Sequence, residues 1–361
     1  MEFTTGGRLE VAITPADVGK RVSVRRLAGP GESTERFTDT VGVLTSWDDG
    51  VLSITRRTGE EVRIMASSLV AGKVVPAAPA RRRGPATSVR ELTEVAARGW
   101  PAVETERLGE WTLRASVGEL RDGGTSGRSP GEHPLKDGGG RRVGFTRRAN
   151  SALPVGDPGV SLDDALDRVR DWYAARGLPP YVVVSTGTAG SDEVLAAELE
   201  RRGWTAEGTT VVRVGALAPL ADTDADTGRV QLSREPDDGW TALYHRSAEA
   251  PPEAVKVLAG GPSVWFATVP GEDGPAAIGR VVIDGRWAGF AALEVAPAHR
   301  RQGLATLVMA ALAQRALEEG ASAAYLQVET DNDAARALYD GLGFTDHHHY
   351  HYRRAPQDGP R

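Results

Sequence analysis

The chain has 361 residues, of which 40% are hydrophobic and 25% charged, and its formal net charge at pH 7 is −6. This composition is that of ordinary globular proteins, and at this length it predicts two or three domains. The chain contains no cysteine, which excludes disulfides, thiolate metal sites and a thioester acyl-enzyme.

The N-terminal segment lacks the basic and apolar regions of an export signal, and no run of apolar residues approaches the roughly 18 that a membrane helix needs. We therefore expect a cytoplasmic protein with no membrane span. Residues 1–76 contain 10 Lys/Arg and 10 Asp/Glu. This neutral balance does not favour nucleic acid as a partner.

In residues 1–76, apolar and polar residues alternate in short runs that are typical of strands. Asp48-Asp49-Gly50 predicts a hairpin turn between two of these runs. The runs are Arg21–Arg25, Thr40–Leu44, Val51–Thr55 and Glu61–Ile64. Several strands of this size predict a small β-barrel of the SH3-like or Sm-like type. We interpret it as a structural or oligomerisation module, with peptide or RNA binding as the alternative.

Residues 77–87 predict a Pro/Ala/Arg-rich linker, and residues 88–215 a second domain. Within this domain we expect a mobile loop over Gly118–Gly140 and the following elements: a helix over Ser88–Ala97, paired strands over Trp111–Ala115 and Gly144–Asn150, a helix over Leu162–Arg176 and a strand over Tyr181–Ser185.

Residues 216–229 predict a second linker, and residues 230–355 a third domain. The patterns indicate a strand over Val230–Leu232, a helix from Trp240 to His245 and beyond, and strands over Val264–Val269, Ala277–Ile283 and Trp287–Val295. The segment Leu199–Thr205 matches Tyr339–Thr345 in spacing. This repeat predicts that the second and third domains are related halves.

The most informative stretch runs from Gly289 to Tyr339. It predicts an apolar strand to Val295, a turn at Pro297, a loop that opens into a helix from about Ala305 to Glu319, a strand over Ala324–Val328 and a short helix. The first N–H groups of a helix lack intrahelical partners and lie at the positive end of its dipole. Arg300 and Arg301 add positive charge, so the loop is suited to a pyrophosphate. It has neither the P-loop nor the GxGxxG pattern, which argues against ATP and dinucleotides.

The pattern Arg300-x-x-Gly303-x-Ala305, followed by Asn332-x-x-Ala335-x-x-Leu338-Tyr339 and Gly343-Phe344, resembles the GNAT superfamily of N-acetyltransferases. The resemblance implies an α/β (α+β) fold, with a mixed central sheet flanked by helices, in tandem. The first half lacks the loop motif and has Leu199 at the position of Tyr339, so it resembles a degenerate copy that does not bind coenzyme A.

The resemblance also implies acetyl-CoA as co-substrate and a primary amine as acceptor. It assigns catalytic roles to Glu294, as base, and Tyr339, as proton donor to the thiolate. The implied cofactor-binding residues are Leu293, Val295, Arg300, Arg301, Gln302, Gly303, Leu304, Ala305, Thr306 and Asn332. Within this set the backbone N–H of Val295 is expected to hold the thioester carbonyl.

Each of these residues also has a structural interpretation. Glu294 is the charged group of an apolar strand and could make a structural hydrogen bond. The ring of Tyr339 could pack in the core, and Asn332 could be an N-cap. In the run His347–Tyr352, strand alternation places His347, His349 and His351 on one face and His348, Tyr350 and Tyr352 on the other. We do not expect a metal there.

The resulting hypothesis is an acetyl-CoA-dependent N-acetyltransferase that transfers the acetyl group directly to an amine in a ternary complex. The alternative is a catalytically silent acyl-CoA-binding regulatory or scaffold protein. The acceptor, whether small molecule, peptide or protein, stays open, as does a homodimer.

Overall fold

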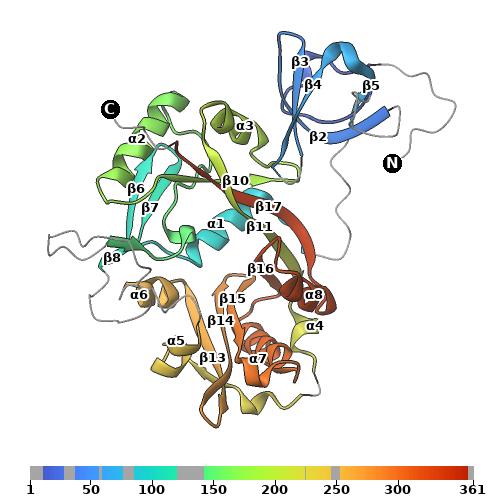
Figure 1. Cartoon of the computed structure of the whole chain (residues 1–361). Helices are drawn as coiled ribbons and strands as arrows, with labels where there is room; N and C mark the ends of the chain where they lie inside the picture. The colour runs from blue at the N-terminus through green and yellow to red at the C-terminus, as the bar shows by residue number, and fades with distance from the viewer. Residues whose placement is uncertain are drawn as a thin grey trace, which may run out of the picture.

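The structure is a computed structural model that describes residues 11–27, 37–56, 59–75, 85–119, 142–223, 225–244 and 253–356. Its described residues form an N-terminal sheet and two α/β halves (Figure 1). The predicted linker at 77–87 and the predicted loop at Gly118–Gly140 lie mostly outside these residues. None of the described helices has both the length and the apolar character needed to cross a bilayer.

The N-terminal region is a curled, five-stranded antiparallel sheet that forms half a barrel. Its strand order is β4-β3-β2-β1-β5. The strands are β1 (Arg21–Leu27), β2 (Phe37–Asp48), β3 (Val51–Thr55), β4 (Glu61–Met65) and β5 (Leu69–Val74). Asp49 and Gly50 both have positive φ angles, 49° and 76°, which a two-residue turn of this hairpin requires. The predicted strands and turn are confirmed.

The first half contains α1 (Val89–Arg98), β6 (Glu104–Leu108), β7 (Trp111–Ala115), β8 (Val117–Glu119), β9 (Arg142–Gly144), α2 (Leu162–Ala174), β10 (Tyr181–Thr186), α3 (Glu193–Arg201) and β11 (Thr205–Ala216). Ser88 caps α1 by accepting a hydrogen bond from the backbone N–H of Glu91 at 3.1 Å. The predicted helices and the strand at Tyr181 are confirmed.

One prediction in the first half is wrong. The segment 144–150 does not pair with β7, whose partner is β6. Only its first residue belongs to a strand, because β9 ends at Gly144 and pairs with β8. The chain then turns through a 3-10 helix at Arg147–Ala149, where the Asn150 side chain donates to the carbonyl of Phe145 at 2.7 Å. Side-chain bonding of this kind competes with a strand ladder.

The second half contains α4 (Ala218–Ala221), β12 (Gln231–Ser233), α5 (Asp238–Leu243), α6 (Ala254–Ala259), β13 (Ser263–Gly271), β14 (Gly274–Asp284), β15 (Trp287–Val295), α7 (Leu304–Glu318), β16 (Ala323–Glu329), α8 (Asp333–Gly341) and β17 (Thr345–Arg354). The segment predicted as the second linker includes α4, whose Leu220 is buried in the core under α7. His245, the predicted continuation of α5, lies outside the described residues.

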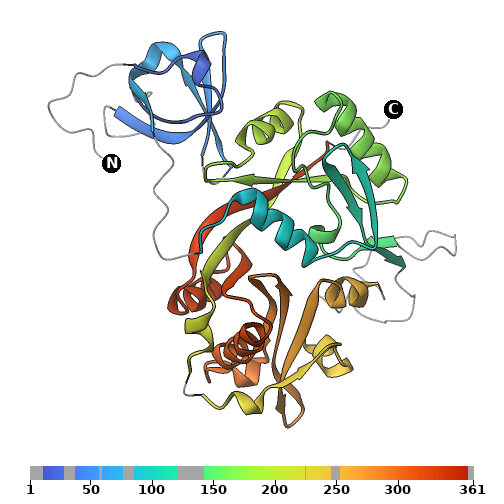
Figure 2. The same cartoon turned by 180° about the vertical axis from the view of Figure 1, so that it is seen from behind.

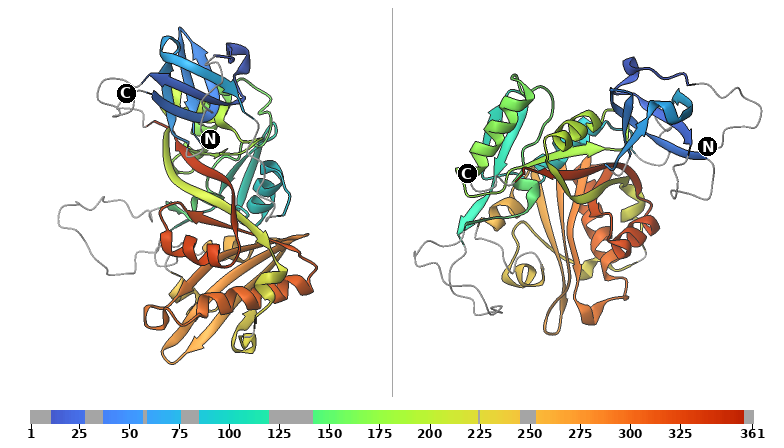
Figure 3. Two further views of the ribbon diagram at one scale, coloured as in Figure 1. Left: turned by 90° about the vertical axis from the view of Figure 1, so that its right-hand side faces the viewer. Right: turned by 45° about the horizontal axis from the view of Figure 1, so that its top comes forward.

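The two halves share one eight-stranded sheet of order β10-β17-β11-β16-β15-β14-β13-β12. The C-terminal strand β17 lies between β10 and β11 of the first half, and β11 lies between β17 and β16 of the second (Figures 1 and 3). Each half therefore completes its sheet with a strand from the other. The matched segments Leu199–Thr205 and Tyr339–Thr345 are the ones that lead into these two strands.

Helices cover the two faces of the sheet. On one face α7 packs over β13–β15 around a core that includes Val281, Leu307, Val308 and Leu312. On the other, α1 crosses the shared strands, where Leu92 and Val95 contact Val212 and Tyr352 in one cluster (Figure 2). The sheet is antiparallel except for β15 and β16. The parallel pair therefore lies beside α7, in the second half.

Candidate active site

The N-terminus of α7 is open and positively charged. Gly303 is its N-cap, with φ 78° and ψ 2°, and no side chain among the described residues caps the helix. A Cβ on Gly303 would meet nothing within 4 Å, so the space beside the backbone is free. The first turn contains no acidic residue. The first N–H groups and the helix dipole are thus available to an anion.

The side chains of the loop confirm its exposure. Arg300, Arg301 and Gln302 are exposed, and Arg301 has a left-handed φ of 63°. Arg300 Nε donates to the carbonyl of Val295 at 3.3 Å. Leu304 differs, because its side chain is buried in the core. It can reach a ligand only through its backbone.

Beside this loop, the strands β15 and β16 separate. They pair in parallel only from Trp287 to Phe290 on β15, so residues 291–295 leave β16. A bulge opposite Gly279 accompanies this change, and Ala292 takes a φ of 51° there. The bulge interrupts the alternation of side chains that a regular strand has. A gap thus opens in the sheet at the N-terminus of α7.

Three of the predicted residues lie along this gap. Leu293 and Val295 pack against the core under α7, and Glu294 lies between them, partly buried. The N–H of Ala296 donates to the carbonyl of Ala276 at 2.9 Å. Since bonded and non-bonded positions alternate in antiparallel pairs, the N–H of Val295 points away from β14 and toward the gap.

Tyr339 approaches the same region from α8. It is partly buried, packs against the core under α7 and stacks edge-on against Phe344, with ring centroids 5.8 Å apart. Burial, together with the negative charge of Glu294, raises the pKa of Tyr339 to about 12, and the positive charge of Arg213 opposes that rise. The phenol is therefore protonated at neutral pH and can donate a proton.

Asn332 has a structural role in this arrangement. It is the N-cap of α8, and its side chain accepts a hydrogen bond from the N–H of Ala335 at 3.0 Å. The side chain is exposed. Its visible function is to begin the helix that carries Tyr339.

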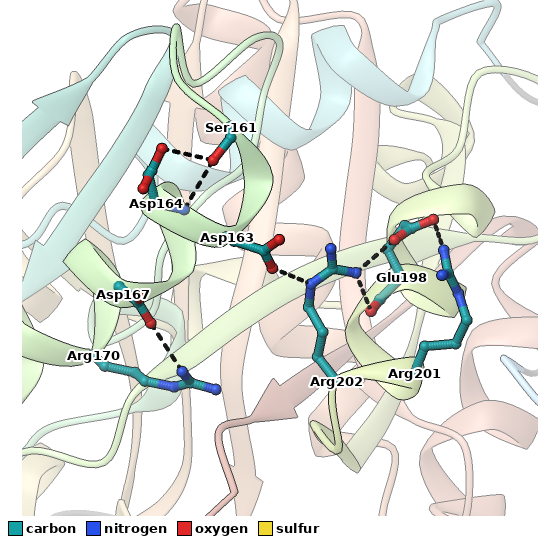
Figure 4. A network of polar contacts seen from close by, with 8 residues as sticks. All are labelled: Ser161, Asp163, Asp164, Asp167, Arg170, Glu198, Arg201 and Arg202. Carbon is teal, nitrogen blue, oxygen red and sulfur yellow. Dashed lines mark hydrogen bonds and ion pairs between the residues drawn. The ribbon is translucent and has the colours of Figure 1, made fainter.

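The corresponding helix of the first half, α2, is closed to anions (Figure 4). Ser161 caps it by accepting from the N–H of Asp164 at 3.2 Å, and Asp163 and Asp164 occupy its first turn. Arg202 bonds Asp163 at 2.6 Å and also Glu198. One first-turn N–H of α2, that of Asp164, thus already bonds an oxygen of the protein, and the two carboxylates of this turn repel an anion.

Sequence reasoning missed one residue of this region, Arg213 on β11. Its side chain is buried and reaches across to α8, where it donates to the carbonyl of Arg336 at 3.1 Å and pairs with Asp340. The sequence contains a feature that could have identified it, because Arg213 is the single charged residue in the apolar run from Val211 to Gly215. A charge in a buried strand requires a partner.

Comparisons with known proteins agree with this arrangement. The chain is 28% identical over 348 residues to "Probable histone acetyltransferase Rv0428c" of Mycobacterium tuberculosis, covering 95% of this chain and 97% of that protein. It is 27% identical over 278 residues to "Uncharacterized N-acetyltransferase YobR" of Bacillus subtilis, covering 73% of this chain and 98% of that protein. A GCN5-related N-acetyltransferase from Kribbella flavida has a similar fold, with a TM-score of 0.51 and 18% identity, over 75% of this chain and 97% of that chain.

The fold and the site define an N-acetyltransferase of the GNAT superfamily, which is an acyltransferase class. The chain belongs to the family described as "Probable histone acetyltransferase Rv0428c C-terminal", whose model matches residues 135–353. Residues 16–73 match the model "Rv0428c N-terminal Sm-like domain". This agrees with the predicted small-barrel module and with the half-barrel of the structure.

Proposed function

We propose that this enzyme transfers an acetyl group from acetyl-CoA directly to a primary amine bound at the same time. The observation that carries the proposal is the open, positive N-terminus of α7, placed beside the gap between β15 and β16. Coenzyme A is an anion with a pyrophosphate, and its thioester arm must reach the reacting centre. The α7 terminus suits the pyrophosphate, and the gap gives the arm a path into the sheet.

We assign the pyrophosphate to the backbone N–H groups and side chains of residues 300–306, with Arg300 and Arg301 supplying charge. The N–H of Val295 is the proposed donor to the thioester carbonyl, where negative charge develops as the amine attacks. Leu293 lies on β15 beside the gap that the thioester arm is proposed to enter. Asn332 contributes by ordering α8.

The proposed reaction moves one acetyl group and balances two protons. The amine nitrogen attacks the thioester carbonyl carbon, and the C–S bond breaks. Glu294, directly or through water, accepts the proton that the amine loses, and Tyr339 gives its phenolic proton to the leaving thiolate. The charge of Glu294 acts on the Tyr339 phenol and raises its pKa, which supports assigning the two residues to one site.

The kinetic test uses a panel of primary amines and follows CoA thiol release with both substrates varied. A ternary complex gives intersecting lines in double-reciprocal plots, and we expect that result. Parallel lines would indicate a covalent acetyl-enzyme and would refute direct transfer. Binding of acetyl-CoA without thiol release from any amine would refute the acetyltransferase assignment.

A further inference from the structure

A cavity lies at the junction of the two halves, on the face of the sheet opposite α7. Its outer part has a volume of about 300 Å³ and is lined by Arg147, Arg148, Thr210, Glu329, Tyr350 and Tyr352. A second, inner pocket of about 40 Å³ shares Arg148, Tyr350 and Tyr352 with it and is lined by α1 residues. The outer part lies in the size range of small-metabolite sites. The inner pocket has room for one small group.

The cavity adjoins the gap in the sheet. Gln327 lines its inner pocket, and the preceding residue, Leu326, is the last of β16 to pair with β15. Leu326 and Val328 pack under α7, so Gln327 faces the other side. A molecule in this cavity therefore approaches the gap from the face opposite the α7 terminus.

Two guanidinium groups in the cavity lack a carboxylate partner among the described residues. Arg148 Nε donates to Gln327 Oε1 at 2.7 Å, and the guanidinium lies 5.5 Å from the centre of the Trp100 ring. Arg114, which is buried, donates to the carbonyl and hydroxyl of Ser151 at 3.1 and 3.0 Å. These partners are neutral, whereas Arg147 pairs with Glu207 at 3.1 Å. Confined positive charge without a counter-ion favours an anionic ligand.

The hydroxyl of Tyr350 supports the same conclusion. It is buried and forms no well-directed hydrogen bond within the described residues, although it lies near Arg148 and Tyr352. A buried hydroxyl without such a bond can donate to a ligand oxygen. At the mouth of the cavity Glu329 is exposed, and its negative charge suits an ammonium group.

We propose that this cavity is the acceptor site and that the acceptor is a small amine that also carries a carboxylate. Arg148 holds the carboxylate, with Arg114 and Tyr350 behind it, and Glu329 lies on the side where the ammonium group enters. A planar carboxylate matches the guanidinium fork and fits the small inner pocket. This inference rests on the proposed acetyl transfer and specifies its substrate class.

The test measures calorimetric binding of amino acids, each paired with its carboxamide, to the full chain with and without acetyl-CoA. We expect at least one acid to bind about ten-fold or more tightly than its amide, as one charge-assisted contact provides. Arg148→Gln should remove that preference while leaving the amide's affinity unchanged. Arg148→Lys, which keeps the charge but loses the fork, should weaken binding of the acid less.

Arg170→Gln is the matched control, because Arg170 lies 5.5 Å from the centre of the Trp204 ring and outside the cavity. It should keep the acid preference. If no acid is preferred over its amide, or if Arg148→Gln weakens acid and amide equally, the inference is wrong. Failure of acetyl-CoA to bind would instead overturn the proposed function, since the acid preference can be measured without it.

Discussion

Arg213, on strand β11 of the first half, forms an ion pair with Asp340 at the end of helix α8 in the second half. The same guanidinium forms an ion pair with Asp346 at 2.9 Å and donates a hydrogen bond to the carbonyl of Phe344 at 2.9 Å. Both ends of the turn between α8 and β17 are thus fixed by a residue from the other half. Since α8 carries Tyr339, the first half positions a proposed catalytic group.

We expect Arg213→Met to lower both stability and turnover. The substitution leaves carboxylates and a carbonyl without their cation, which costs about 2 kcal/mol after allowing for the exposed side chain of Asp340. It should also lower kcat more than it changes KM for acetyl-CoA. Chemical denaturation and steady-state kinetics measure the two effects. Arg354→Met, a change at the end of β17, is the control, and an equal loss in both variants would contradict the specific role of Arg213.

The open N-terminus of α7 leads to a separate prediction about ligand binding. Acetyl-CoA should raise the melting temperature of the wild type, and Gly303→Glu should abolish that rise, because the carboxylate repels the pyrophosphate. Gly303→Asn should retain it, since Asn tolerates the left-handed conformation.

The other end of α7 provides a control for backbone strain. Gly320 has a φ of 91°, and a Cβ there would also meet nothing within 4 Å. Gly320→Glu should therefore lower the melting temperature to a similar extent but preserve the shift caused by acetyl-CoA. Loss of the shift in both variants would mean that strain, rather than the anion site, explains the result.

Tyr339→Phe tests proton donation. The ring still packs against Phe344, so stability and the affinity for acetyl-CoA should change little, while kcat falls by about a hundred-fold or more. With a pKa of about 12, the phenol stays protonated, so the wild-type rate should not decline from its ionisation below about pH 10. Tyr325→Phe, on the α1 side of the sheet, is the control. An unchanged kcat in Tyr339→Phe would remove the phenol from the mechanism.

Asp192 gives a prediction about pH and stability. Burial, with the nearby charge of Glu193, raises its pKa from 3.8 to about 7. The folded chain thus binds this proton more tightly than the unfolded chain, so the resulting stabilisation is present below about pH 4 and is lost as pH rises through 7. Asp192→Asn should be more stable than wild type at pH 8, by about 1 kcal/mol given its partial exposure. The two should be nearly equal at pH 4.

Thermal or denaturant unfolding at the two pH values measures this difference. The control is Asp273→Asn, which changes an exposed turn residue between β13 and β14. A gain at pH 8 that persists unchanged at pH 4 would show that the carboxylate's ionisation is not its cause.

The sequence predicted the local elements around the site well. The helix expected from about Ala305 to Glu319 is α7, and the strand ending at Val295 is β15, because apolar periodicity and the glycine at the loop are local signals. The absence of the loop motif from the first half also predicted that the two halves differ. The structure explains that difference: Ser161 caps α2, and Asp163 and Asp164 place negative charge in its first turn.

Other features depend on distant contacts and could not be predicted in the same way. Alternation along β17 indicates a strand but does not specify its neighbours in the sheet. The φ of Ala292 has no sequence signal, since alanine rarely takes this conformation. The cavity at Arg148 forms only when residues from both halves and from several separate strands meet.

The interleaving of β11 and β17 also sets the order in which the molecule can be completed during synthesis. Strand β10 ends at Thr186, yet its neighbour in the sheet, β17, runs to Arg354. A nascent chain therefore exposes the β17-facing edges of β10 and β11 until the residues up to Arg354 have left the ribosome. The eight-stranded sheet can be completed only after β17 has been made, and a copy truncated before β17 would present those unpaired edges to other chains.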